Sequence, residues 1–229
     1  GGPAPYWHSY TYDKAGNRTK EVQHGIGGAA DTVRTYTYAA PGNGSRLNSL
    51  AHTGPSGDRT QTYNYDAIGN TAAIHTTGDG PTSSTQTFDW NTEGKLAKTS
   101  EAGNDVTYVY TPGGNRLIRK DPTGSTLYLP GGTELHAYNG ADKATGTRYY
   151  DFGGQAIAMR TANGTVTYLT ADHQGTAQIA INATTQQATI RRFTSFGTIR
   201  GFDENATWPN DKGFLGATQD PTGLTHLGA

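Results

Sequence analysis

A short phrase recurs along the chain: two aromatic residues separated by one other residue, followed by a corner that contains glycine. Its clearest copies are Tyr63-Asn-Tyr65-Asp66-Ala-Ile-Gly69-Asn70-Thr71 and Tyr10-Thr-Tyr12-Asp13-Lys-Ala-Gly16-Asn17. Looser copies occupy residues 36–47, 88–96 and 108–117, so that successive copies start about 20 to 27 residues apart. Self-similarity at such a spacing predicts a repeat architecture, in which each unit is stabilised by its neighbours.

Each copy predicts a β-hairpin. Residues two apart in a strand project from the same face, and aromatic side chains suit that half-buried surface. Asp bonds backbone amides within turns, while Gly and Asn accept a positive φ. The aromatic residues predicted to share one face are Tyr12, Tyr38, Tyr65, Trp90 and Tyr110. The predicted turn residues are Asp13, Gly16, Asn17, Asp66, Gly69, Asn70, Gly94 and Gly114. A single hairpin is marginal in water, so the copies must stack.

Composition agrees with an all-β chain. Of 229 residues, 32 are Gly and 14 are Tyr, and only 33% are hydrophobic, which suits a thin sheet with many turns. Disorder is the alternative on composition, but the periodic aromatics count against it. A net charge of −1 gives no attraction to nucleic acid. No Cys is present, and no apolar run is long enough for a membrane span.

We predict two regions. Residues 1–120 form the array of repeated hairpins, and residues 121–229 continue with strands of a different sequence character. Asn163-Gly164 predicts a hairpin with a two-residue loop. From Gly201 onward the abundance of Gly, Pro and Asp predicts irregular structure.

The Tyr-x-Tyr-Asp-x-x-Gly-Asn-Arg phrase resembles the YD repeat of bacterial Rhs proteins, Tc-toxin C components and teneurins. The second half resembles the Rhs repeat-associated core domain through Asp172-His173-Gln-Gly175, Phe193-Thr-Ser-Phe196-Gly197 and Asp220-Pro-Thr-Gly223-Leu224. In the family, the Leu-Gly-Ala phrase that corresponds to residues 227–229 is usually followed by a self-cleavage segment and a variable toxin.

The resemblance implies a curved, spiralling antiparallel sheet of tandem YD hairpins, as part of a hollow shell. It implies a secreted or cell-surface bacterial protein that encapsulates and delivers a C-terminal toxin. The implied partners are that toxin and neighbouring YD repeats. Open sheet edges further predict self-association. The alternative is an adhesion module that binds a carbohydrate or receptor through exposed aromatics such as Trp7, Trp90 and Trp208.

No motif in the sequence predicts catalysis, a cofactor or a metal. The seven His residues lack metal-ligand spacing. We assign Asp13, Asp66 and Asp89 to equivalent turn positions, and Asp172 and His173 to structural hydrogen bonding. Asp121 and Asp220 each open an Asp-Pro-Thr-Gly phrase, which we interpret as a turn. The rival interpretation, an aspartyl autoprotease, needs two carboxylates held close together.

Overall fold

The computed structural model describes residues 4–39, 45–79, 83–201 and 206–227. These residues are almost entirely β-structure. The helical structure among them is a single 3-10 turn, η1 (Phe214–Gly216). The chain divides into two compact units, Gly1–Asn104 and Asp105–Ala229, which are described separately below. The predicted boundary near residue 120 concerned sequence character and stays a prediction.

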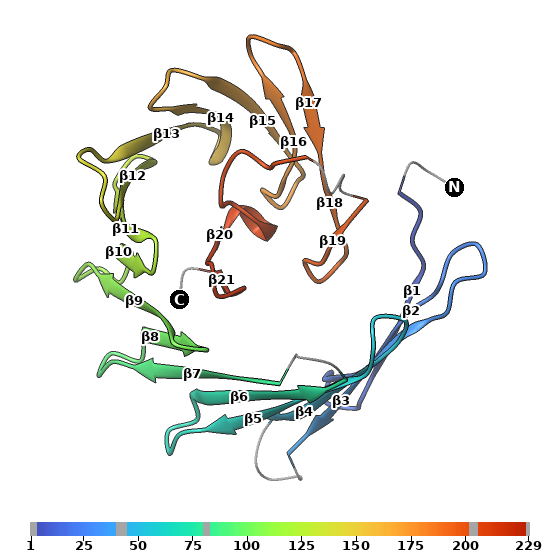
Figure 1. The fold of residues 1–229 in the computed structure, drawn as a ribbon. Coiled ribbons are helices and arrows are strands. Elements are labelled where there is room, and N and C mark those ends of the chain that lie inside the picture. The colour runs from blue at the N-terminus through green and yellow to red at the C-terminus, as the bar shows by residue number, and fades with distance from the viewer. Residues whose placement is uncertain (1–3, 40–44, 80–82, 202–205, 228–229) are drawn as a thin grey trace. The chain divides into compact units, whose positions relative to one another are not determined.

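The first unit is a run of antiparallel strands, several of which lie side by side in Figure 1. They are β1 (His8–Tyr12), β2 (Arg18–Gln23), β3 (Thr32–Tyr38), β4 (Leu47–Thr53), β5 (Arg59–Tyr65), β6 (Thr71–Gly78), β7 (Ser84–Trp90) and β8 (Leu96–Glu101). Each strand pairs antiparallel with the next in sequence. The predicted all-β class of tandem hairpins is therefore confirmed.

The second unit continues this connectivity. Its strands are β9 (Asn104–Tyr110), β10 (Arg116–Asp121), β11 (Gly124–Leu129), β12 (Thr133–Tyr138), β13 (Thr145–Phe152), β14 (Gln155–Thr161), β15 (Val166–Ala171), β16 (Ala177–Asn182) and β17 (Ala188–Ile190). Four short strands follow in two pairs: β18 (Arg192–Phe193) with β19 (Ile199–Arg200), and β20 (Thr218–Gln219) with β21 (Thr225–His226). The segment predicted to be irregular, from Gly201 onward, thus contains one small ladder, β20 with β21, and the turn η1.

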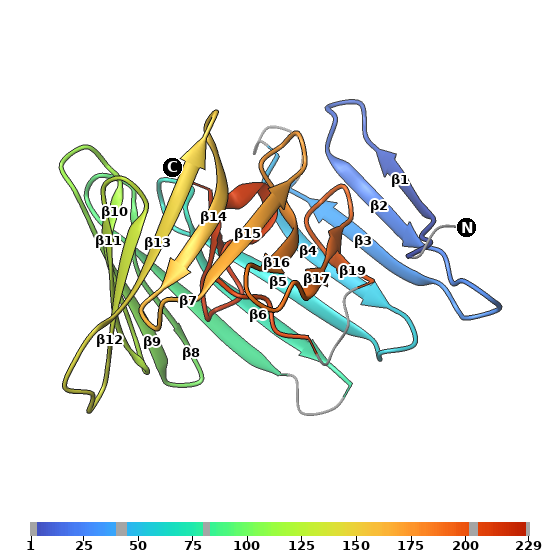
Figure 2. The same cartoon turned by 90° about the horizontal axis from the view of Figure 1, so that it is seen from above.

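The last part of the chain packs on one face of the second unit's sheet. In Figure 1, β20 and β21 lie on the side toward which β10 to β16 curve. Strands β13 to β16 run side by side, as Figure 2 shows and their pairing requires. A small core lies between sheet and segment, formed by Tyr149, Met159, Leu169 and Ala180, with Trp208 of the segment packed against it. We call residues 206–227 the C-terminal segment.

The hydrophobic cores are small in both units. In the first, the buried side chains include two polar ones, Glu21 and His52, as well as Phe88. A sheet with so little apolar burial depends on its ladder hydrogen bonds and turns to define the fold. Among the described residues, no helix is long and apolar enough to cross a membrane.

Candidate functional site

One turn geometry closes many of the hairpins. The first turn residue donates its backbone N–H to the carbonyl four residues later, and the glycine at the fourth position donates back to the first residue. The same pair of bonds also occurs at residues 213–217, around η1, where it does not join two paired strands. The hairpins that it closes in the described part of the chain number eight, at residues 13–17, 66–70, 91–95, 111–115, 161–165, 172–176, 194–198 and 220–224. The glycine has a positive φ at every one, from 73° at Gly94 to 100° at Gly69. This is a three-residue loop with glycine in the left-handed region.

Asp66 shows what the first turn residue contributes. Its Oδ1 accepts the backbone N–H groups of Ile68, Gly69 and Asn70, at 2.7 to 3.0 Å, and its Oδ2 accepts the Asn70 side chain. Burial alone would raise the pKa of Asp66, but these hydrogen bonds outweigh it and lower the pKa. Asp13 makes the same contacts with Ala15 and Asn17.

Asp89 does not occupy the equivalent position, so that assignment was wrong. In this copy Asn91 begins the turn, and its Oδ1 accepts the amides of Glu93 and Lys95. Asp89 lies within β7 opposite Lys98. Asn163-Gly164 also differs from the prediction, because the loop closes between Thr161 and Thr165 and holds three residues. In the copy at residues 36–47, the predicted corner includes residues 40–44, which lie outside the described residues.

The second aromatic of a repeat connects it to the repeat before. Tyr38 donates its hydroxyl to the carbonyl of Arg18 at 3.0 Å, and Tyr65 does the same to Leu47 at 2.9 Å. Trp90 donates its indole N–H to Thr71 at 2.8 Å. Each acceptor lies at the start of a strand that leaves the preceding corner. These bonds set the spacing between neighbouring hairpins in the first unit. Tyr12, in contrast, is half exposed.

In the second unit, Asp172 begins one of the same turns. It accepts the amides of Gln174 and Thr176 and the side-chain amide of Gln178. Burial would raise its pKa, but these bonds lower it. His173 is exposed, and Gly175 supplies the positive φ. Asp172 and His173 therefore occupy a turn, and the hydrogen bonds of the Asp172 carboxylate go to two backbone amides and to Gln178.

Asp121 and Asp220, far apart in sequence, converge on one guanidinium. Arg119 donates Nε to Asp121 at 3.2 Å and a terminal nitrogen to Asp220 at 3.2 Å. Arg116 reaches Asp220 at 2.8 Å, and Asp211 lies 3.5 Å from Arg119. We call these five residues the ionic cluster. It ties β10 to the C-terminal segment.

The surroundings of Asp121 in the ionic cluster favour its ionised form. Burial would raise the pKa of Asp121, but bonds from Thr123 and the charge of Arg119 lower it. Both Asp121 and Asp220 also begin turns, as predicted from their Asp-Pro-Thr-Gly phrases. In general acid catalysis by a pair of carboxyl groups, one of the two groups must be protonated. Arg119 bonds both Asp121 and Asp220, and a positive charge in this position opposes the protonation of a carboxylate.

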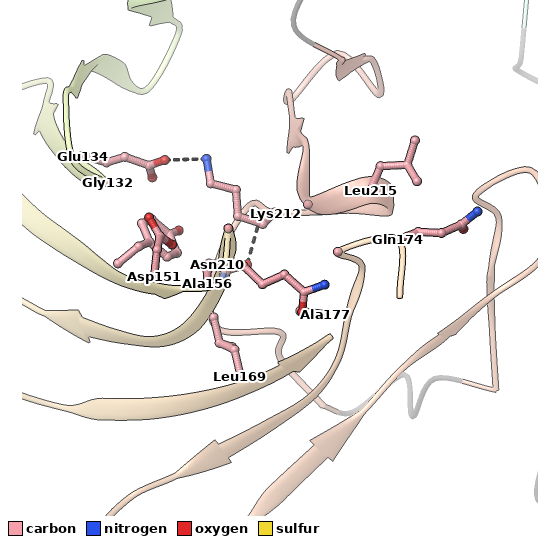
Figure 3. A pocket seen from close by; sticks show the side chains of 15 residues that line it. Gly132, Glu134, Asp151, Ala156, Leu169, Gln174, Ala177, Asn210, Lys212 and Leu215 are labelled. Carbon is pink, nitrogen blue, oxygen red and sulfur yellow. Dashed lines mark hydrogen bonds and ion pairs between the residues drawn. The ribbon is translucent and has the colours of Figure 1, made fainter. Parts of the chain in front are cut away.

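A cavity of about 370 Å³ lies beside the C-terminal segment and is lined by β12 to β16 and by the segment itself. Figure 3 shows Lys212 reaching Glu134, with Asp151 on an adjoining wall. The two ions are 2.6 Å apart, and Lys212 also donates to Thr218 at 2.7 Å. Burial raises the pKa of Glu134 despite the neighbouring ammonium. Among the described residues, no group of His, Asp and Glu side chains is placed to hold a metal ion.

Residues 5–229 match the family model of the teneurin YD-shell. The chain belongs to the teneurin YD-shell family. The YD-repeat family predicted from the sequence is thereby confirmed. A comparison with curated proteins gave no match.

Solved YD-shell structures share the fold. The crystal structure of TcdB2-TccC3 superposes with a TM-score of 0.61 at 17% identity, over 96% of this chain and 14% of that chain. The same complex without its hypervariable C-terminal region gives 0.58 at 16% identity, over 96% and 13%. The Photorhabdus luminescens Tc holotoxin pore gives 0.51 at 16%, over 97% and 15%. This YD-shell chain thus spans 13 to 15% of the length of those chains.

The sequence did not predict the turns that begin at Asp172 and Thr194, and it predicted the turn at Thr161 with the wrong loop length. The corners beginning at Thr161, Asp172, Thr194 and Asp220 lack the aromatic pair in its usual form. These corners share only the pattern of a glycine three residues after a Thr or Asp. Two residue types at one spacing are too common to predict a turn by themselves. The partnership of Arg119 with Asp220 had no sequence signal, because it depends on where the C-terminal segment returns to the sheet.

Proposed function

We propose that this chain is a structural segment of a YD shell that encloses a toxin polypeptide, and that it has no catalytic part in that enclosure. The observation that carries the proposal is the run of hairpins closed by one repeated turn, together with the likeness to TcdB2-TccC3. A wall built from repeated hairpins can be extended without changing the unit, which is what a container needs. The ionic cluster and the small core then fix the C-terminal segment against one face.

The proposal further places the protein outside the producing cell, in a secreted or surface-bound bacterial assembly. It takes as its partners the enclosed polypeptide and the neighbouring repeats. The face of the second unit that carries the C-terminal segment would face the cargo. The opposite face would meet solvent.

Single cysteines test which face is enclosed, because the chain contains no Cys that would react in the background. Gln174 lines the cavity beside the C-terminal segment and is exposed. Tyr168 on β15 is 53% exposed, does not line that cavity, and serves as the control. Q174C and Y168C would each be made in residues 1–229 and in the full natural gene product. Maleimide labelling would then be timed by intact mass.

We expect Q174C to label readily in residues 1–229 and at least ten times more slowly in the natural gene product. Y168C should label at similar rates in both. Denaturation should restore full labelling of Q174C, which separates enclosure from chemical damage. Equal, rapid labelling of Q174C in both proteins would contradict encapsulation on this face.

One observation favours the alternative, an adhesion surface. Tyr150 on β13 is 43% exposed, and Tyr168 on β15 is 53% exposed. Both residues pair with Ala158 on β14, the strand between them. They therefore flank one position on the same face of the sheet. Two exposed aromatic rings at this spacing suit stacking against a sugar. A glycan array with wild type and a Tyr150→Ala/Tyr168→Ala double variant decides: selective binding that the variant loses supports adhesion, and no binding opposes it.

A further inference from the structure

Three side chains at the first hairpin of unit one form a chain of hydrogen bonds. Ser9 Oγ lies 2.8 Å from His24 Nε2, and His24 Nδ1 lies 3.1 Å from Asp31 Oδ2. Ser9 is on β1, His24 follows the end of β2, and Asp31 precedes β3. The three therefore come together through the pairing of consecutive strands, although they are spread over 23 positions in sequence.

The surroundings fix the orientation of the imidazole. Asp31 Oδ1 accepts the backbone N–H of Gly25 at 2.9 Å, so one carboxylate oxygen is anchored while the other faces His24. The Gly25 amide, followed by the His24 side chain, lowers the pKa of Asp31. The indole of Trp7 stacks on the imidazole, with ring centroids 3.8 Å apart. The ring is thus held on one edge by a carboxylate and on one face by an aromatic.

These contacts select one tautomer. An ionised Asp31 accepts a hydrogen bond and therefore places the imidazole proton on Nδ1. In the neutral imidazole Nε2 then carries no proton, and it accepts a hydrogen bond from the Ser9 hydroxyl. A hydroxyl bonded to a base that is oriented by a carboxylate is the arrangement that activates serine for nucleophilic attack.

We propose that Ser9 is an activated nucleophile toward small acyl esters, with His24 as its general base and Asp31 as the residue that positions His24. In the first step Ser9 Oγ adds to the ester carbonyl, His24 Nε2 takes the hydroxyl proton and returns it to the departing alkoxide, and an alcohol leaves. In the second, His24 deprotonates a water that attacks the acyl-serine, and the proton returns to Ser9 Oγ as the acid leaves. The balance is ester plus water to acid plus alcohol.

The open position of the site limits the substrate. Ser9 is exposed, and the Asp31 side chain retains 47% of its accessible surface. Water is not excluded, so the electrostatic gain of an enclosed site is absent. We therefore expect slow turnover of activated esters such as p-nitrophenyl acetate, and covalent capture by a fluorophosphonate. This activity goes beyond the structural role proposed above and does not depend on it.

The test measures fluorophosphonate labelling of residues 1–229 by intact mass and peptide mapping. We expect one adduct per chain, on Ser9, with fluoride as the leaving group. Ser9→Ala should abolish it, and His24→Gln should slow it about 100-fold, as general bases typically contribute. Ser56→Ala removes an exposed serine from the turn between β4 and β5 and should leave the adduct unchanged. Thermal melts verify that each variant is folded.

The role of Asp31 in positioning the His24 imidazole requires a measurement of its own. Asp31→Asn should slow labelling about tenfold, and Asp31→Glu should recover part of the rate. Nitrogen chemical shifts of His24 should report the Nδ1-protonated tautomer in wild type and a mixture in Asp31→Asn. Absence of a Ser9 adduct, or equal labelling rates in wild type and folded His24→Gln, would overturn the proposal and leave these contacts a purely structural role.

Discussion

At the scale of single residues, each corner depends on one glycine with a positive φ. Thr111-Pro112-Gly113-Gly114 offers a matched pair, because Gly114 has a φ of 82° whereas Gly113 is not among the positive-φ residues. A side chain in the left-handed region costs about 1 to 2 kcal/mol. In contrast, alanine at a compatible φ restricts the unfolded chain and is neutral or slightly stabilising.

We therefore expect Gly114→Ala to lower the free energy of unfolding by about 1 kcal/mol. Gly113→Ala should stay within about 0.5 kcal/mol of wild type. Urea titrations of both variants measure the difference. Equal destabilisation by both would show that steric contact, and not φ, decides the cost at this corner.

The carboxylate at the first turn position makes stability depend on pH. The folded-state pKa of Asp66 is lowered by bonds to its own turn, so the stabilisation is complete above the unfolded value of about 3.9 and is lost as pH falls through the lower folded value. Asn91 shows that an amide can make the same backbone contacts.

Asp66→Asn should therefore melt close to wild type at pH 7 and lose less melting temperature than wild type between pH 5 and pH 2.5. Asp66→Ala, which makes none of the contacts, should melt lower throughout. Scanning calorimetry across this pH range provides the check. A steeper acid loss in Asp66→Asn than in wild type would refute the role of the charge.

At the scale of elements, the ionic cluster attaches the C-terminal segment to β10. Asp220 is 5% exposed and faces both Arg116 and Arg119, whereas the Asp211 side chain is 30% exposed and meets Arg119 at 3.5 Å. Removing one charge from a buried pair leaves its partner uncompensated, at a cost of about 3 to 5 kcal/mol. A partly exposed ion pair contributes far less, because solvent screens it.

We expect Asp220→Asn to destabilise the second unit by about 3 kcal/mol, and to expose Lys212 to trypsin at a temperature where wild type resists. Asp211→Asn serves as the control, with a loss of about 1 kcal/mol or less. The measurements are a guanidinium titration and timed proteolysis followed by mass spectrometry. If both variants resist trypsin as wild type does, the segment is held by its apolar contacts alone.

These elements also show how far the sequence could predict the structure. The hairpins of residues 10–38 and 63–90 were predictable, because aromatic alternation and Gly-Asn corners are local signals. The role of Arg119 could not be predicted, because its guanidinium joins Asp121 of β10 to Asp220 of the C-terminal segment. Ser9, His24 and Asp31 were likewise invisible, since only the strand register brings them together. Local chemistry is readable from a sequence, whereas contacts made by returning segments depend on the tertiary fold.

At the scale of the whole molecule, the first and the last strand of the large sheet each have one partner among the described pairings: β1 pairs with β2, and β17 pairs with β16. Unpaired edges recruit other chains. Ile190 on β17 is 41% exposed and adds an apolar surface to that edge. We expect concentration-dependent association of residues 1–229.

Ile190→Lys should weaken that association, because a charge on an edge strand opposes strand addition. Thr170→Lys introduces the same charge on an exposed position of β15, which has neighbours on both sides, and should have little effect. Light scattering over a 100-fold concentration range measures the mass. A monomer at every concentration for wild type would contradict an open edge.

The strictly sequential pairing of strands has a consequence for how the chain acquires its structure. Nearly all ladder contacts join residues close in sequence, so contact order is low and each hairpin can form soon after its own residues are available. The bond between Arg116 and Asp220 spans 104 positions and must wait for the largest loop closure. Pulled from its C-terminal end, the protein should release residues 206–227 first and then unzip one hairpin at a time.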